Sequence, residues 1–112
     1  MRSTLVLAGL LGTLVFGPAA QAADEHGDPG TGRAFALQAC TPCHVVSRRQ
    51  VSPQRFAVAP SFDAIANAPT TTPSGLHAFL STPHPTMPNL ILSPEEQRDV
   101  IGYIMSLKRE TQ

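Results

Sequence analysis

The chain contains one short motif that combines two thiols with an imidazole: Cys40-Thr41-Pro42-Cys43-His44. Two cysteines three residues apart, followed at once by a histidine, form the attachment motif for c-type haem. On one helical turn both cysteines point the same way, so both can bond to one porphyrin edge, and His44 at i+4 from Cys40 can ligate the iron. The motif therefore predicts one haem c, bound covalently through Cys40 and Cys43, with His44 as a metal ligand.

Three other uses of a Cys-x-x-Cys pair have to be compared with haem attachment. A zinc site needs about four ligands, and beyond this motif the chain offers no second cysteine pair and only His26, His77 and His84. A thioredoxin-like redox pair should follow a strand and open a helix of a βαβ unit, whereas this motif follows a helix-like segment. A structural disulfide remains open, although it explains neither the adjacent histidine nor the tight spacing.

The N-terminal 22 residues have the features of a secretory signal peptide. Arg2 supplies a positive charge, residues 5–16 are almost wholly apolar, and residues 20–22 read Ala-Gln-Ala, the small-residue pattern that signal peptidase recognises. We expect cleavage after position 22, export to a bacterial periplasm and a single domain over residues 23–112. The apolar run is short for a membrane span, so we expect no stable insertion after cleavage; an uncleaved anchor is the alternative.

The size and charge of the expected mature chain restrict its function. Removing residues 1–22 from the 112-residue chain leaves 90 residues, in which seven Lys and Arg face eight Asp and Glu, a formal net charge of −1. So small a domain buries a marginal core by itself, and a haem would add an apolar plate to pack around. The balance of charge gives no indication of binding to nucleic acid or to an anionic membrane.

Apolar spacing and punctuation by proline predict a set of short helices. The expected helices cover residues 32–39, 62–68 and 73–81, with a last one that begins at Pro94. The polar segment 23–31, which contains two glycines, reads as a frayed tail. In the third helix we expect Leu76, Phe79 and Leu80 to be buried.

The last helix carries the clearest local signals. Ser93 and Glu96 form a capping box around Pro94, which suits the first helical position. An apolar stripe of helical period follows, made of Val100, Tyr103, Ile104 and Leu107. We expect Lys108 and Arg109 to complement the helix dipole at its C-terminal end.

The second axial position of a haem bound through His44 decides what that haem could do. Prolines at three positions of segment 83–88 make it stiff without being helical, which suits a loop that holds one side chain in place. We expect Met87, in this loop, to be the second metal ligand, because a thioether keeps the iron six-coordinate and favours the ferrous state. Met105, in the last helix, reads as a packing residue, and His84 is the rival ligand.

With these motifs in place, the chain resembles a class I cytochrome c, a small monohaem electron carrier with His/Met ligation. The resemblance covers essentially all of the expected mature chain. It rests on Gly32, the 40–44 motif, Pro60 before a short helix, Met87-Pro88-Asn89 in a loop and the stripe Val100, Tyr103 and Ile104. It implies an all-α fold of three to five short helices wrapped around one covalently bound haem, with the N- and C-terminal helices crossing.

The resemblance also implies roles for individual residues. Gly32 would let the two crossing helices approach closely, Tyr103 would pack at the crossing, and the Pro60 carbonyl would accept a hydrogen bond from His44 and so take part in binding the cofactor. Two departures from the family stand out, because Ala36 occupies a position that is usually aromatic and the chain has no tryptophan. In place of the tryptophan, one of three arginines could hold a haem propionate. These are Arg48, Arg49 and Arg55.

The expected function is that of a soluble, monomeric one-electron carrier, not an enzyme, whose iron cycles between Fe(III) and Fe(II). Its redox partners would be a quinol-oxidising complex or a dehydrogenase upstream and a terminal oxidase or reductase downstream. With Lys108 as its one lysine, the chain should dock through a mostly apolar patch. The alternatives are a dedicated cytochrome subunit of a periplasmic dehydrogenase or oxidase and a ligand-binding or peroxidase-type haem protein, which would require Met87 to be absent from the iron.

Overall fold

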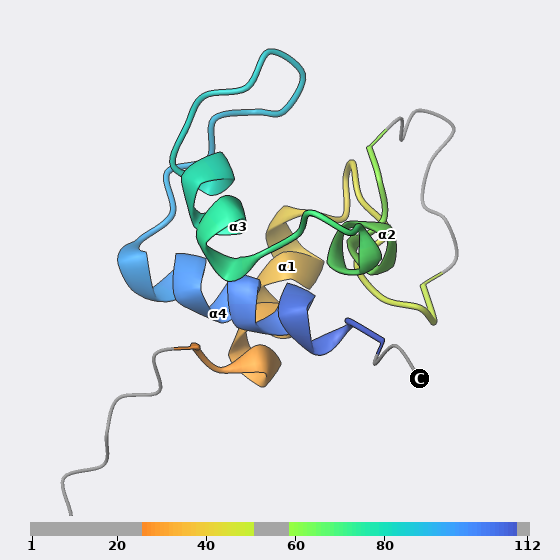
Figure 1. Ribbon diagram of the computed structural model, residues 1–112. Helices are drawn as coiled ribbons and strands as arrows, with labels where there is room; N and C mark the ends of the chain where they lie inside the picture. The colour runs from red at the N-terminus through yellow and green to blue at the C-terminus, as the bar shows by residue number, and fades with distance from the viewer. Residues whose placement is uncertain (1–25, 51–58, 110–112) are drawn as a thin grey trace, which may run out of the picture.

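A computed structural model describes residues 26–50 and 59–109, and in these residues the chain is helical without strands. The helices are α1 (Pro29–Ala39), α2 (Phe62–Asn67), α3 (Pro73–Leu80) and α4 (Pro94–Ser106), shown in Figure 1. This confirms the expected all-α fold of three to five short helices. The predicted signal peptide and Arg55 lie outside the described residues. No helix in the described ranges is both long and apolar enough to cross a membrane.

Each helix begins at a side chain that accepts a hydrogen bond from the backbone of its first turn. These N-caps are Asp28, Ser61, Thr72 and Ser93, and the last forms the predicted capping box. Asp28 Oδ1 accepts from Thr31 N at 2.6 Å. Helix α1 therefore begins at Pro29, three residues before the predicted start, and the assignment of residues 29–31 to a frayed tail is wrong.

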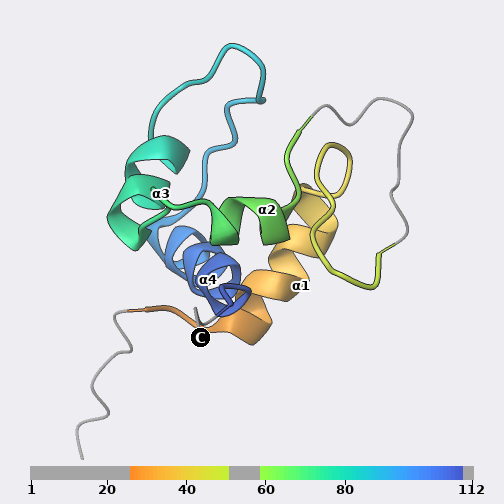
Figure 2. The same ribbon diagram turned by 45° about the vertical axis from the view of Figure 1, so that its right-hand side comes forward.

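Helices α1 and α4 cross in direct backbone contact, as Figures 1 and 2 show. Gly32 lies at the contact, where a Cβ atom would collide with the backbone carbonyl of Asp99. The Asp99 side chain, 8% exposed, accepts a hydrogen bond from Asp28 N at 2.7 Å, which ties the start of α1 to α4. On the next turn of α4, a Cβ at Gly102 would collide with the carbonyl oxygen of His26.

A small apolar core lies between these helices and α2. It comprises Ala36, Val46, Phe62, Ala66, Val100, Tyr103 and Ile104, all buried. Tyr103 reaches across it, with its ring centroid 6.2 Å from that of Phe62 and its hydroxyl donating to the Val46 carbonyl at 2.8 Å. Ala36 is completely buried, and the neighbouring Phe35 is only half-buried and lines the cavity described below.

Helix α3 differs from the prediction, because none of its residues is buried. Leu76 and Leu80 are half-buried, and Phe79 is 47% exposed. All three side chains line the cavity described below. Leu76 and Leu80 also pack against the edge of the core, so this apolar face is shared between the core and the cavity.

Candidate functional site

The two cysteines follow α1 directly, in a turn that continues its hydrogen bonding. Cys40 caps the helix through a bond from its N–H to Ala36 O at 2.9 Å, and His44 N donates in turn to Cys40 O at 2.9 Å. The thiols are not joined to each other: Cys40 is half-buried and Cys43 exposed. Burial raises the pKa of the Cys40 thiol, because desolvation disfavours the thiolate.

The histidine of the motif is fixed by two contacts from the segment that begins α2. Its Nδ1 lies 2.7 Å from the carbonyl oxygen of Pro60, so the ring is oriented by the hydrogen bond that the resemblance implies. The His44 ring also meets Phe62 edge-on, with centroids 5.4 Å apart and planes at 61°. Because a carbonyl only accepts, Nδ1 carries the proton in this contact, and the other ring nitrogen, Nε2, keeps its lone pair for a metal.

One cavity connects the motif to α3 and to the loop before α4. Its volume is about 840 Å³, within the roughly 300–1,000 Å³ of typical small-molecule and cofactor sites. Cys40, Cys43 and His44 line it, and most of the remaining lining is apolar. Of the residues that the structure describes, no Lys, Arg, Asp or Glu lines this cavity, and no group of three His, Cys, Asp or Glu side chains could hold a metal ion.

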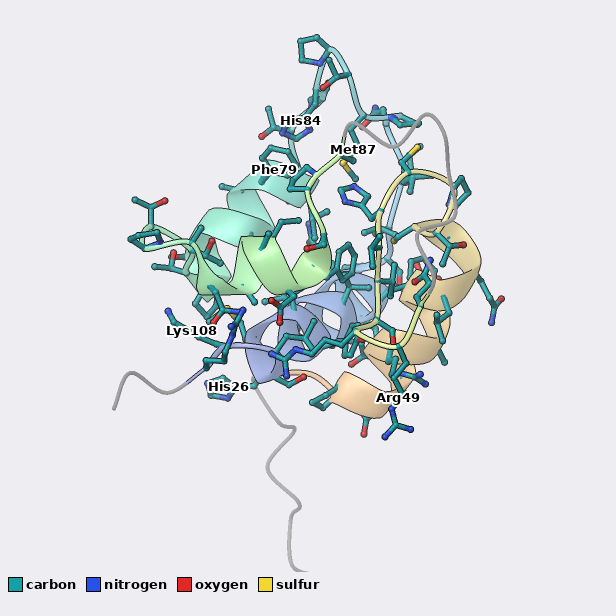
Figure 3. All side chains as sticks on the ribbon, turned by 90° about the vertical axis from the view of Figure 1, so that its right-hand side faces the viewer. His26, Arg49, Phe79, His84, Met87 and Lys108 are labelled. Carbon is teal, nitrogen blue, oxygen red and sulfur yellow. The ribbon has the colours of Figure 1, made fainter. Side chains whose placement is uncertain are left out.

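The loop between α3 and α4 brings both candidate ligands to the same cavity. Met87 and His84 each line it, and both side chains are half-buried. The His84 ring is stacked on Phe79, with centroids 3.5 Å apart and planes at 29° (Figure 3). His84 is thus engaged with an aromatic neighbour, whereas Met87 has no hydrogen bond or ring contact within the described part of the chain.

The arginines proposed for a propionate have other positions. Arg48 binds Asp63 through Nε at 2.6 Å and donates from Nη2 to Leu107 O, 2.8 Å away. Arg109 binds the second oxygen of Asp63 at 2.6 Å, and the hydrogen bond from Arg48, helped by both positive charges, lowers the pKa of this carboxyl. Neither Arg48 nor Arg49 lines the cavity, and Figure 3 shows Arg49 well away from Met87.

The same interactions revise the expected end of α4. The helix ends at Ser106, before Lys108 and Arg109, and its last turn contains no basic residue. Arg48 supplies the cation there, because its guanidinium binds the Leu107 carbonyl just beyond the helix. This contact joins residues far apart in the sequence, and the local sequence pattern does not indicate it.

The sequence interpretation also overlooked polar residues that line the cavity. Three of them, Thr70, Thr86 and Asn89, have side chains that make no hydrogen bond within the described residues. The hydroxyl of Thr71 donates to the Ile65 carbonyl, and that of Thr72 accepts from Gly75 N at the start of α3. Thr70, Thr86 and Asn89 are therefore available to donate hydrogen bonds to a ligand. The run of three threonines and the asparagine beside Met87-Pro88 were the available signals.

Among curated proteins, the chain is similar to cytochrome c-552 of Bradyrhizobium diazoefficiens. It is 40% identical to this chain over 81 residues, which cover 72% of this chain and 76% of the relative. No protein-family model matches the chain. No solved structure gives a significant match.

Proposed function

The chain belongs to the class I cytochromes c, and we propose that it carries single electrons through one haem c bonded to Cys40 and Cys43. The observation that supports this most strongly is a shared cavity, lined on one side by the Cys-x-x-Cys-His motif and on another by Met87. Such a haem supplies an Fe(III)/Fe(II) couple. His44 and Met87, which line the same cavity, would be the two residues that hold its iron.

The chain's own residues fit such a group. Leu76 and Leu80 of α3 are half-buried and line the cavity, and the exposed Phe79 lines it beside His84. A flat apolar ligand would cover the apolar surface that these side chains leave open to the cavity. Thr70, Thr86 and Asn89, which line the same cavity, would supply hydrogen-bond donors for its carboxylates in place of the arginines.

Two contacts to His44 and the apolar lining of the cavity would prepare the site for electron transfer without a change of ligands. The Pro60 carbonyl holds the proton on His44 Nδ1 and so fixes both the tautomer and the ring orientation. Phe62 limits rotation of the same ring from the side. The mostly apolar lining would lower the polarity around the haem, and with the Met87 thioether it would raise the reduction potential.

Export and partners form part of the same proposal. A signal peptide over residues 1–22 would direct the chain to a periplasm. There it would be a monomer, and it would carry electrons without acting as an enzyme. It would take electrons from a quinol-oxidising complex or a dehydrogenase and pass them to a terminal oxidase or reductase. Because no Lys, Arg, Asp or Glu among the described residues lines the cavity, we expect the rate of this transfer to change little with ionic strength. A steep fall of the rate with added salt would contradict this.

The decisive experiment is expression in a host that matures c-type haem, followed by visible absorption spectroscopy of the oxidised and reduced protein. We expect haem c bands and a pigment that stays with the polypeptide after acid–acetone extraction, because thioether bonds resist this treatment. A colourless product, or a pigment that is extracted, would reject the proposal.

A matched pair of variants tests the second ligand. Met87→Ala should abolish the near-infrared sulfur-to-iron charge-transfer band of the oxidised protein and lower its reduction potential. Met105→Ala is the control, since Met105 lies in α4 and does not line the cavity. If both variants keep the band, or if both lose it, the assignment of Met87 is wrong.

A further inference from the structure

The segment 83–92, which we call the Met87 loop, has few attachments to the rest of the molecule. Within the described chain, its hydrogen bonding stays inside the segment, where Leu90 N donates to Pro88 O at 2.9 Å. Its three prolines stiffen the backbone, but a proline has no N–H with which to bind a neighbouring element. A stiff loop without hydrogen bonds to its surroundings can still rotate as a unit, so some other contact must fix the position of Met87.

The ring stack between Phe79 and His84 is such a contact. The two centroids are 3.5 Å apart with planes at 29°, and one ring belongs to α3 and the other to the Met87 loop (Figure 3). His84 stands between Pro83 and Pro85, so its backbone is held while its ring is fixed by Phe79. The interaction between two stacked aromatic rings contributes free energy in addition to that gained by burying their surface area.

The end of α3 that carries Phe79 is itself fastened to α4. Gln97 is 8% exposed, and its Nε2 donates to Ser81 Oγ at 2.9 Å and approaches His77 O at 3.4 Å. A buried amide that satisfies the C-terminal end of a neighbouring helix is costly to displace. The contacts with Gln97 therefore hold the end of α3 that carries Phe79. The ring stack in turn restrains the Met87 loop at His84, three residues before Met87.

We propose that the Phe79–His84 stack is a positioning contact that keeps the Met87 sulfur within reach of the metal. His84 then acts through the loop and is not itself a ligand. This inference rests on the proposed ligation by Met87. Opening of the stack would let the loop turn, remove the thioether from its place and admit an external ligand.

Two variants of His84 in the haem-loaded protein separate ring stacking from imidazole chemistry. His84→Phe keeps an aromatic ring but has no nitrogen, and His84→Ala removes the ring. We expect His84→Phe to keep the sulfur-to-iron band of the oxidised protein at its original intensity. His84→Ala should weaken the band and raise the apparent affinity for cyanide by roughly two- to tenfold, the factor that the loss of one aromatic pair implies.

Variants of Phe79 test the contact from the other side. Phe79→Leu keeps an apolar side chain without a ring and should behave as His84→Ala does, whereas Phe79→Tyr should behave as the unaltered protein does. Helix content from far-ultraviolet circular dichroism and retention of the pigment after acid–acetone treatment show that each variant is folded and loaded. The band and the cyanide affinity then report the position of Met87 and not general damage.

The possible failures can be told apart. If His84→Ala keeps the original band and cyanide affinity, the stack does not position Met87, and ligation by Met87 is then decided by the Met87→Ala variant alone. If His84→Phe loses the band together with His84→Ala, the imidazole itself is required and the positioning role is wrong. If the unaltered protein has no such band, ligation by Met87 fails, and the inference fails with it.

Discussion

The crossing of α1 and α4 and the side of the molecule built by α3 are constructed in opposite ways. At the crossing, backbones touch at Gly32, and the Asp28 N–H and the buried Asp99 carboxylate satisfy each other. Helix α3 has no buried residue, and its apolar side chains line a cavity of about 840 Å³. The first region is held together by contacts between protein atoms, whereas we expect the haem to cover the cavity-facing side of the second. The two regions should therefore respond differently to loss of the haem.

The largest effect should come from removing the thiols that hold the ligand. In the double variant Cys40→Ser/Cys43→Ser, we expect no pigment after acid–acetone extraction and a loss of much of the roughly 5–15 kcal/mol that stabilises a small domain. Urea unfolding measures the total, and amide hydrogen exchange should show that α3 loses protection before α1 and α4. Equal loss of protection in all four helices would contradict the division into two regions.

The next largest effect should come from the crossing itself. Gly32→Ala places a methyl group against the Asp99 carbonyl, so the helices must move apart, at a cost of about 3 kcal/mol by urea unfolding of the holoprotein. Gly30→Ala is the control in the same helix, since its methyl group would meet only the Asp28 side chain, 3.1 Å away. Equal stability of the two variants would show that the contact at Gly32 is not tight.

A smaller effect should come from the hydrogen bond that crosses the core. Tyr103→Phe leaves the buried Val46 carbonyl without its donor, which should cost about 1–3 kcal/mol of unfolding free energy. Ser106→Ala is the control on the same helix, because that hydroxyl donates to Tyr103 O on the exposed side. We expect the control to change stability by less than half as much, and a reversed order would contradict this description of the core.

The smallest effect should come from Asp63 at the surface, and it should depend on pH. The hydrogen bond from Arg48 lowers the pKa of Asp63 below its ordinary value of 3.8, so the paired carboxylate stabilises the fold above that pH. This contribution is lost as the pH falls through the lowered folded-state pKa. Asp63→Asn should therefore be less stable than the original protein at neutral pH, and the difference should shrink in acid and in high salt. A difference that is constant with pH would contradict the role of the carboxylate.

Signals contained in a few neighbouring residues predicted the helices well. The capping box of Ser93 and Glu96 and the Thr72-Pro73 pair mark helix starts that the structure has at the same positions. Asp28-Pro29 is the same kind of signal, but it stands among glycines and polar residues, and composition alone assigned it to a tail. The start of α1 is therefore determined by the N-cap pair Asp28-Pro29 and not by the polarity of the surrounding segment.

Contacts between distant residues account for what the sequence did not predict. The apolar spacing in α3 is correct, but spacing cannot tell a face that packs on protein from one that lines a cavity, so Phe79 was wrongly expected to be buried. The partners of Arg48 lie 15 and 59 residues away. The ring stack of Phe79 and His84 depends on how the proline loop folds back, which no residue pattern reveals.

The hydrogen bond between Asp28 and Asp99 spans 71 residues, which has a consequence for the order of events during biosynthesis. A nascent chain that has not yet produced α4 has nothing against which Gly32 and Ala36 can pack, and early closure would also carry the entropic penalty of a long loop. We therefore expect α1 and the two thiols that follow it to pack in their final place only after α4 has been synthesised. A maturation enzyme has that whole interval in which to reach them.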